Sequence, residues 1–410
     1  MSGRPAFIST CAQGLEPVLE QELRELGMPR VRRLRGAVLF GHALEHGYRA
    51  LLWSRIASRV LMEVARFPCG DGDALYAGVR SVDWSQHLQA RGSLAVNFVG
   101  VSRELRHSGY SARLTKDAIV DQFRDRTGSR PDVDRHDPHL RIHVHLAAGS
   151  ATVSIDLAGV PLQVRGLDRE AGDAPLKETL AAAILRMAGW PAAAKEGRPL
   201  CDPMCGSGTF LLEAAMLARD VAPGLARRRW GHDYWLGHDS STWSALIDEA
   251  RERREAKQNE DIGVYGGDKD ADVLPLAVRN LARAGFSDIA RNLVCRDVRD
   301  SQPPEPIPGL LVTNPPYGSR MADEARADAL TRALGDVLRQ RFLGWTAWIL
   351  VGRPRQARAL GLKPLARHSV WNGRLDARLL EVPIASRAPK GGPRGREEAP
   401  SPTMRRSSDV

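Results

Sequence analysis

The stretch LCDPMCGSGTFLLEAAMLA, residues 200–218, decides the fold of the larger part of this chain. Its apolar start ends at Asp202, a turn with two glycines follows, and an apolar helical pattern begins at about Thr209. Glycines let the backbone pass close beneath a ligand, and the free N–H groups at a helix start favour electron-rich atoms. The sequence therefore predicts a strand, a ligand-binding turn and a helix. The ligand contacts that we expect here are Asp202, Pro203, Cys205, Gly206, Ser207, Gly208 and Thr209.

Beyond this stretch, apolar strand patterns continue to alternate with helical ones. The expected strands lie at residues 199–202, 263–267, 293–295, 310–313 and 346–351, and the expected helices at 178–187, 209–219, 273–284 and 328–341. Such alternation is typical of a doubly wound parallel sheet. Segments 366–371 and 374–382 then flank Asn372 and Gly373, the preferred pair for a tight type I′ turn. The sequence therefore predicts an α/β domain that ends in an antiparallel hairpin.

The first 160 residues carry shorter patterns in mixed order. The expected strands lie at residues 7–10, 38–40, 60–67, 94–101, 141–146 and 152–157, and the expected helices at 14–26, 44–58 and 117–126. The last two strands alternate apolar and polar residues, as a hairpin with one buried face does. This mixture predicts a compact α+β module. A connector rich in Gly, Asp and Pro follows it, and from about residue 385 the chain has too few apolar residues to fold.

The composition narrows the class of protein. Lysine and arginine number 59 against 49 aspartates and glutamates, and this net charge of +10 indicates a polyanionic partner. We expect neither a membrane span nor a secretory signal, because no apolar run of sufficient length occurs. The five scattered cysteines indicate a reducing cytoplasm. Four histidines between residues 136 and 145 lack a nearby cysteine pair, so we expect no metal.

A second motif, TNPPYG, occupies residues 313–318 at the carboxyl end of an expected strand. Ligands bind at this edge of open α/β sheets. The two prolines fix the backbone, so that the Asn314 side chain and the Pro315 carbonyl point in set directions. Two acceptors can hold both hydrogens of an exocyclic amine and aim its lone pair at a methyl donor. The expected catalytic residues are Asn314, Pro315, Pro316 and Tyr317, with the tyrosine ring as a face on which a base stacks.

Two aspartates follow expected strands between these motifs. Asp268 ends one strand, where a carboxylate can bind both ribose hydroxyls of a nucleoside. Asp297 follows the next strand and can accept a hydrogen bond from an adenine amino group. Helix capping or a turn is the alternative role for each of them.

Two basic segments are candidates for RNA contact. Arg227, Arg228, Arg229 and Trp230 combine charge with a stacking ring, although an ordinary surface loop would have the same composition. Lys116 precedes an expected helix together with Asp117, and here RNA contact and N-capping remain equally open.

Seven segments together resemble the THUMP-domain class I methyltransferases, and among them the first half of the bacterial ribosomal RNA large subunit methyltransferase L family. The resemblance covers about residues 5–384. The segments are STCAQGLEPVLEQEL (9–23), LLWSRIASRV (51–60), KDAIVDQF (116–123), PLKETLAAAIL (175–185), DPMCGSGTFLLEAAMLA (202–218), APGLARRRWG (222–231) and TNPPYG (313–318).

The resemblance implies S-adenosylmethionine as cofactor and the N2 amine of one guanine in 23S rRNA, or in its large-subunit precursor, as target. It also implies that Lys177, Glu178 and Thr179 lie near the cofactor. The implied parts are a ferredoxin-like region (1–55), a THUMP module (56–160), a linker (161–175), a Rossmann-like methyltransferase domain (176–384) and a disordered basic tail (385–410). The long form in this family has a second methyltransferase domain that makes 7-methylguanine. The tail of this chain stands in its place, so only the guanine-N2 activity is expected.

Other functions share part of this pattern. Methyltransferases of adenine N6 in DNA, or of a glutamine side chain, use the same Asn-Pro-Pro-Tyr motif but need no THUMP module. The first 160 residues therefore favour RNA over DNA as the partner, and they give no sign of an obligate protein partner. A non-catalytic RNA-binding factor for ribosome assembly is the third alternative, and it would not need both intact motifs.

Overall fold

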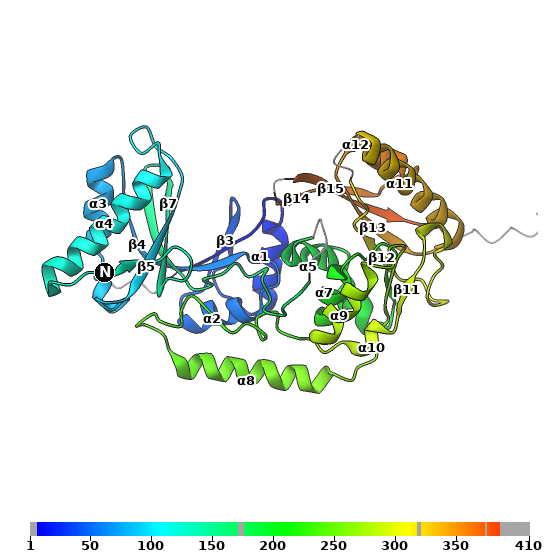
Figure 1. Cartoon of the computed structure of the whole chain (residues 1–410), viewed down its shortest axis with the longest axis horizontal. Coiled ribbons are helices and arrows are strands. Elements are labelled where there is room, and N and C mark those ends of the chain that lie inside the picture. The colour runs from blue at the N-terminus through cyan, green and yellow to red at the C-terminus, as the bar shows by residue number, and fades with distance from the viewer. Residues whose placement is uncertain (1–5, 171–175, 318–320, 374, 386–410) are drawn as a thin grey trace, which may run out of the picture.

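The computed structural model describes residues 6–170, 176–317, 321–373 and 375–385, and it contains two sheets with helices packed against them (Figure 1). The tail expected from residue 385 falls almost wholly outside these described residues, as do Gly318 and part of the expected linker. None of the helices that the structure describes is both long enough and apolar enough to cross a membrane.

The N-terminal sheet has eight strands among the described residues, in the order β2-β3-β1-β4-β8-β7-β5-β6. The strands are β1 (Phe7–Thr10), β2 (Arg32–Leu34), β3 (Ala37–Phe40), β4 (Arg59–Pro68), β5 (Ser93–Val99), β6 (Asp132–Val133), β7 (Leu140–Ala147) and β8 (Ser150–Asp156). The ten-residue strand β4 pairs with β1 at its start and with β8 along most of its length. The parts expected at residues 1–55 and 56–160 therefore share one continuous sheet, which confirms the predicted α+β character.

Four helices accompany this sheet: α1 (Glu16–Glu25), α2 (Leu44–Trp53), α3 (Gly72–Arg80) and α4 (Ser108–Thr127). The helix expected over residues 44–58 ends at Trp53, so that prediction was too long. The buried carboxylate of Glu22 accepts hydrogen bonds from the Ser54 hydroxyl (2.6 Å) and from the Arg55 and Ile56 N–H groups (3.1 and 3.3 Å). Because these donors bond to Glu22, the backbone leaves the helix there and turns toward β4.

The C-terminal sheet has the order β11-β10-β9-β12-β13-β15-β14. The strands are β9 (Leu200–Asp202), β10 (Val264–Asp268), β11 (Leu293–Cys295), β12 (Leu310–Thr313), β13 (Thr346–Val351), β14 (Ala366–Asn372) and β15 (Leu375–Pro383). Strands β9 to β13 run parallel, whereas β15 is antiparallel to both β13 and β14. This confirms the predicted doubly wound sheet with a terminal antiparallel hairpin.

Helices cover both faces of this sheet. They are α5 (Glu178–Met187), α6 (Trp190–Lys195), α7 (Thr209–Ala218), α9 (Leu274–Arg283), α10 (Ser287–Ala290), α11 (Met321–Arg341) and α12 (Pro354–Ala359). Leu310 and Val312 of β12 join the core that contains α5 and α7. Leu311 between them joins the core that contains α11. The two-residue alternation of a strand thus accounts for the two layers of helices.

The turn of the terminal hairpin differs from the prediction. Asn372 pairs with Leu375 and is therefore still a strand residue, so the turn begins after it, at Gly373. Gly373 has a φ of +66°, and glycine adopts this left-handed conformation at little cost. Asn372 does not lie in that region, so the expected Asn-Gly type I′ pair is wrong by one position.

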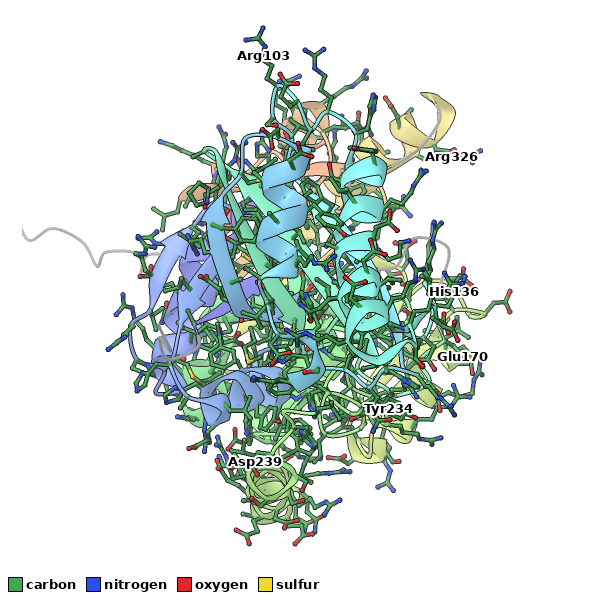
Figure 2. All side chains as sticks on the ribbon, turned by 90° about the vertical axis from the view of Figure 1, so that its left-hand side faces the viewer. Arg103, His136, Glu170, Tyr234, Asp239 and Arg326 are labelled. Atoms are coloured by element: carbon green, nitrogen blue, oxygen red, sulfur yellow. The ribbon has the colours of Figure 1, made fainter. Side chains whose placement is uncertain are left out.

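The sequence patterns did not indicate the full extent of α8 (Ser240–Lys257), which links the two halves of the molecule. It runs along the lower edge of Figure 1 from α2 toward α10. Arg49 of α2 forms an ion pair with Glu249 of α8 at 2.8 Å. Seen from the end that carries α3 and α4, the charged side chains of α8 spread into solvent below Asp239, which caps the helix (Figure 2).

Replacing Glu22 tests the cause of the early end of α2. Glu22→Ala leaves the Ser54 hydroxyl and two N–H groups buried without their acceptor, so we expect the free energy of unfolding to fall by about 2–4 kcal/mol. Urea unfolding measures this change. Glu45→Ala, at an exposed site on α2, is the control and should change stability by less than about 0.5 kcal/mol. Equal effects of the two substitutions would contradict the role given to Glu22.

Candidate active site

The sequence-predicted polar residues meet at the carboxyl edge of the C-terminal sheet. In sheet order, β11 ends at Cys295, β10 at Asp268, β9 at Asp202 and β12 at Thr313. The chain passes from β9 to β10 and β11 on one side, and then returns to β12 and β13 on the other side of β9, so the strand order reverses between β9 and β12. Ligands of open α/β sheets bind at such a point.

The turn after β9 is shaped by its two glycines. Gly206 and Gly208 have φ values of +53° and +82°, in the left-handed region that favours glycine. A Cβ atom on Gly208 would lie 3.1 Å from Cβ of Ala277 on α9, whereas one on Gly206 would meet nothing within 4 Å. Gly208 is therefore needed for packing, and the space in front of Gly206 is open to a ligand. The other predicted turn residues, Pro203, Cys205, Ser207 and Thr209, are buried.

Asp202 connects the two motifs. Its Oδ1 atom accepts hydrogen bonds from the Thr313 hydroxyl at 2.7 Å and from the Met204 N–H at 3.1 Å. The side chain is only 2% exposed, and burial raises its pKa to about 7 although both hydrogen bonds favour the charged form. The negative charge of Asp268 raises this pKa further. A positively charged ligand group beside this carboxylate would therefore offset the free-energy cost of burying its negative charge.

Asp268 and Asp297 both make backbone contacts. Oδ2 of Asp268 accepts from the Gly206 N–H at 2.9 Å, and Oδ1 accepts from the Asp270 N–H at 3.0 Å. Each carboxylate oxygen can accept a further hydrogen bond. Asp297 caps a short 3-10 turn by accepting from the Arg299 N–H at 2.9 Å, and it also forms an ion pair with the Arg299 guanidinium. The alternative capping role is thus seen at Asp297.

The Asn-Pro-Pro-Tyr loop is held from several sides. Oδ1 of Asn314 accepts a hydrogen bond from the Tyr317 hydroxyl, and burial raises the pKa of that hydroxyl well above its usual range. The tyrosine ring packs on Gly352, where an added Cβ would lie 2.9 Å from ring atom Cγ. Gln356 of α12 donates to the Pro316 carbonyl at 3.0 Å and accepts from the Gly352 N–H at 3.1 Å. Asn314 and Tyr317 are therefore fixed relative to β13 and α12.

Two further residues support the glycine turn, and the motifs did not identify them. Asn280 of α9 is buried; its Nδ2 donates to the carbonyls of Ser207 (3.0 Å) and Glu170 (2.9 Å). Arg169 donates to the Ser207 hydroxyl at 3.5 Å and forms an ion pair with Glu178 at 3.1 Å. The only available signal for Asn280 was a polar residue within an apolar helical pattern. Of the residues that the resemblance places near the cofactor, Lys177 is exposed, Glu178 half-buried and Thr179 buried.

The structure contradicts part of the RNA-binding prediction. Arg227 donates to the carbonyls of Ala158, Val160, Pro161 and Val164, and its guanidinium stacks 4.5 Å from the centre of the Trp230 ring. Trp230 is only 6% exposed, so it offers no stacking face to RNA. These two residues instead fasten their loop to the connector.

The remaining predicted RNA contacts lie at the surface. Arg228 is exposed, and Arg229 is half-exposed in an ion pair with Asp137 at 2.8 Å. Lys116 is paired with Asp117 inside α4, which begins eight residues earlier at Ser108. The N-capping alternative for this pair is therefore wrong.

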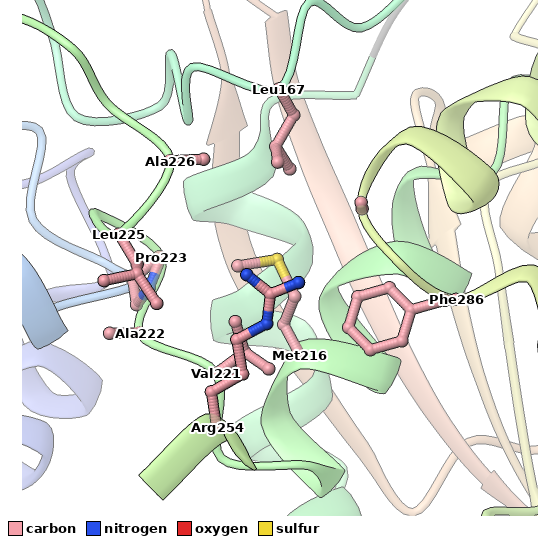
Figure 3. A pocket seen from close by; sticks show the side chains of 10 residues that line it. Leu167, Met216, Val221, Ala222, Pro223, Leu225, Ala226, Arg254 and Phe286 are labelled. Carbon is pink, nitrogen blue, oxygen red and sulfur yellow. The ribbon is translucent and has the colours of Figure 1, made fainter. Parts of the chain in front are cut away.

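Two cavities in the described part of the chain are lined by residues outside the glycine turn and the Asn-Pro-Pro-Tyr loop. One of about 20 Å³, enough for about one water molecule, lies between Met216, Arg254 and Phe286 (Figure 3). A wider hollow of about 420 Å³ is lined by Leu274 and Val278 of α9 and by Cys295, so it borders the edge where β11 ends. Across the described ranges, no three His, Cys, Asp or Glu side chains are grouped as they would be around a metal ion.

A doubly wound sheet with a glycine turn after β9, aspartates after β10 and β11, and Asn-Pro-Pro-Tyr after β12 defines a class I methyltransferase domain. The comparisons with known proteins agree. Residues 165–381 match the family described as RMKL-like, methyltransferase domain, residues 70–156 match the THUMP domain, and residues 6–61 match the RlmL ferredoxin-like domain. The chain belongs to the RMKL-like methyltransferase family.

The chain is also similar to particular proteins. It is 42% identical over 391 residues to ribosomal RNA large subunit methyltransferase K/L of Pseudomonas aeruginosa, which covers 94% of this chain and 54% of that protein. The same enzyme of Pseudomonas entomophila is 43% identical over 383 residues, with coverages of 93% and 52%. The chain therefore spans about half the length of the curated relatives that it matches.

Two crystal structures resemble the whole described fold. The putative methyltransferase SMU.472, complexed with SAH, has a TM-score of 0.81 and 30% identity, over 94% of this chain and 100% of that one. A predicted N6-adenine-specific DNA methylase from Listeria monocytogenes has a TM-score of 0.82 and 27% identity, over 92% and 96% of the two chains.

The raised pKa of Asp202 predicts a pH-dependent stability. In the folded protein this pKa is about 7, compared with a usual value of 3.8, so the ligand-free protein loses stability as the pH rises from about 4 through 7. Asp202→Asn keeps an oxygen acceptor and removes the charge. We expect the variant to be more stable than the wild type at pH 8, by up to about 4 kcal/mol, and equally stable at pH 4. Urea unfolding at both pH values tests this, and a difference independent of pH would refute it.

Proposed function

We propose that this chain transfers the methyl group of S-adenosylmethionine to the exocyclic N2 amine of one guanine in 23S rRNA. The observation that carries the proposal is the hydrogen bond between Asp202 and Thr313, because it holds the glycine turn beside the Asn-Pro-Pro-Tyr loop. The curated relatives are named as ribosomal RNA large subunit methyltransferases, and SMU.472 was crystallised with SAH. The matched THUMP and ferredoxin-like domains also support an RNA substrate.

The residues at the carboxyl edge fit S-adenosylmethionine, which supplies an electrophilic methyl group on a positively charged sulfur. The open space before Gly206 gives the cofactor room. Asp202 would accept from its amino group, and Asp268 would hold the ribose hydroxyls through lone pairs that the turn leaves unused. Asp297 would accept from the adenine amine. The start of α5, with Lys177, Glu178 and Thr179, would close the site.

Asn314 and Pro315 would hold the target amine. A carbonyl oxygen has two lone pairs, so Oδ1 of Asn314 can accept from the amine while it also accepts from Tyr317. The Pro315 carbonyl would accept the second N–H. With both hydrogens held, the nitrogen lone pair is directed away from the base ring toward the methyl donor. The proton would become acidic only as the N–C bond replaces the bond between the methyl group and sulfur, and it would leave to solvent, so no strong base is needed.

The same loop could hold an adenine amine in DNA, and the Listeria neighbour is named as a predicted DNA methylase. Residues 6–61 and 70–156, which match the ferredoxin-like and THUMP models, together with the net charge of +10, favour RNA. We therefore place the reaction in the cytoplasm, on 23S rRNA or its large-subunit precursor, with no DNA or membrane partner.

The test is methyl transfer by the full chain to 23S rRNA from a strain that lacks this modification, followed by mass mapping of RNA fragments. We expect one N2-methylguanine per rRNA and no methylation of duplex DNA. Methyl transfer to DNA alone, or cofactor binding without any methylated RNA, would overturn the proposal.

Asn314→Ala tests the role of the acceptor amide. The variant should bind S-adenosylmethionine with nearly wild-type affinity, because Asn314 is not among the proposed cofactor contacts. Its rate of methyl transfer should fall by about 10²-fold or more, as expected when a transition-state contact is lost. Calorimetry and single-turnover methylation measure the two quantities. A variant that methylates at the wild-type rate would exclude the acceptor model.

A further inference from the structure

One edge of the N-terminal sheet carries an unusual concentration of arginine. Arg30, Arg32, Arg33 and Arg35 occupy four of the six positions from 30 to 35, and all four are exposed. They lie on β2, the outermost strand, and on the turns at its two ends. Residues 30–36 are named the arginine hairpin here.

Nearby carboxylates leave most of this charge unpaired. Glu20 forms ion pairs with Arg33 at 2.5 Å and with Arg24 at 2.7 Å. The carboxylate of Glu16 accepts instead from the N–H groups of Gly14 (2.8 Å) and Gly36 (2.9 Å). Among the described residues, no ion pair joins the other three arginines of the arginine hairpin. These three guanidinium groups are therefore available to an anionic partner.

The arginine hairpin lies beside the methyltransferase domain. The hydrogen bond from Gly36 fixes it to the loop at Gly14 and Glu16. That loop packs on β14: a Cβ atom on Gly14 would lie 2.5 Å from the carbonyl oxygen of Ser369. At the end of β14, a Cβ atom on Gly373 would lie 4.0 Å from Cε of Lys177. The arginine hairpin is thus connected through Glu16 and Gly14 to β14, whose end lies near the start of α5.

The arginine hairpin and the active site also lie on the same side of the molecule. Helix α12 follows directly after the carboxyl end of β13, so it marks the active-site edge. In Figure 1, α12 and the hairpin formed by β2 and β3 lie on the side opposite α8, and β3 stands between the THUMP strands and β14. Figure 2 places Arg103 of the THUMP part on this same side and Asp239 on the opposite one.

Protection of an edge strand against aggregation is the simpler role for such charges. It accounts for Arg32 and Arg33, which lie within β2. It does not account for Arg30 and Arg35, which lie outside the strand. Arg30 has a φ of +58°, a conformation that costs a residue with a side chain about 1 kcal/mol or more, and glycine or asparagine would fit it better. Keeping an arginine at this position indicates a use for its charge.

We propose that the arginine hairpin binds the phosphate backbone of the RNA substrate between the THUMP part and the active site. Guanidinium groups match phosphate geometry and remain charged at all physiological pH values. This inference rests on the proposed function, because it takes the RNA to be the methylated substrate. The arginine hairpin would thereby hold the strand that leads from the THUMP contacts to the target guanine.

The test compares rRNA binding by two double variants of the full chain over a range of salt concentrations. The first variant combines Arg32→Ala with Arg35→Ala. It leaves unchanged both Arg30, whose backbone is left-handed, and Arg33, which forms an ion pair with Glu20. We expect the slope of log affinity against log salt concentration to become less steep by about 1 for each arginine, hence by about 2. The reason is that binding releases fewer counterions from the RNA when a phosphate contact is lost. Arg32→Lys with Arg35→Lys keeps the charge and should retain most of the slope.

A matched control removes two arginines from the opposite side. Arg251 lies on α8 and Arg291 follows α10; both are exposed, and replacing both with alanine makes the same change in charge. This control should keep the wild-type slope, and S-adenosylmethionine affinity should be unchanged in every variant. Equal slopes for the wild type and for the variant with Arg32→Ala and Arg35→Ala would overturn this proposal. The proposed function would still stand if the wild type methylates rRNA. A wild type that neither binds nor methylates rRNA would instead overturn the proposed function.

Discussion

The buried carboxylate of Asp202 is the constraint on which the active site depends. It lies at the end of the central strand β9, and it binds the hydroxyl of Thr313 at the end of β12 and the backbone of the turn that follows β9. Burial disfavours its charge, as the pKa of about 7 indicates. Leucine would fill this place without that cost, but it could not join the two motifs. The presence of an aspartate at position 202 is therefore explained by its role in the active site and not by a contribution to the stability of the sheet.

The position of the N-terminal half is constrained by other buried charges. Arg165 in the connector forms an ion pair with Glu213 of α7 at 3.0 Å, and both side chains are almost completely buried. Arg165 also donates to the carbonyl of Arg55, whose own guanidinium donates to the carbonyls of Met216 and Val221. Removing one partner of such a network leaves a charge buried without compensation, which is strongly destabilising. The contacts therefore hold the N-terminal sheet at one distance from the active site, as recognition of a base within a long RNA would require.

The sequence predicted those parts of the site whose conformation depends on neighbouring residues in the chain. The glycine turn at residues 205–208 needs left-handed conformations, and the Asn-Pro-Pro-Tyr loop follows an apolar strand, so both were visible in sequence. Asn280 and Gln356 were not, because their partners at Ser207 and Pro316 lie 73 and 40 residues away. Trp230 was misinterpreted for a related reason. A run of arginines beside a tryptophan has the same composition whether it faces solvent or, as here, closes over a connector whose carbonyls need donors.

The contacts around Asn314 suggest why this loop is so firmly held. An acceptor that must reorient during methyl transfer would add to the barrier, whereas one that is already in place adds nothing. The Tyr317 hydroxyl donates to the amide oxygen of Asn314, and Gly352 leaves room for the tyrosine ring. The side chain of Gln356 donates to the carbonyl of Pro316, which lies between Asn314 and Tyr317 in the sequence. In the proposed reaction, the target amine would therefore meet acceptors whose positions are set by β13 and α12, and the binding energy of the RNA would remain available for taking the base out of the stack.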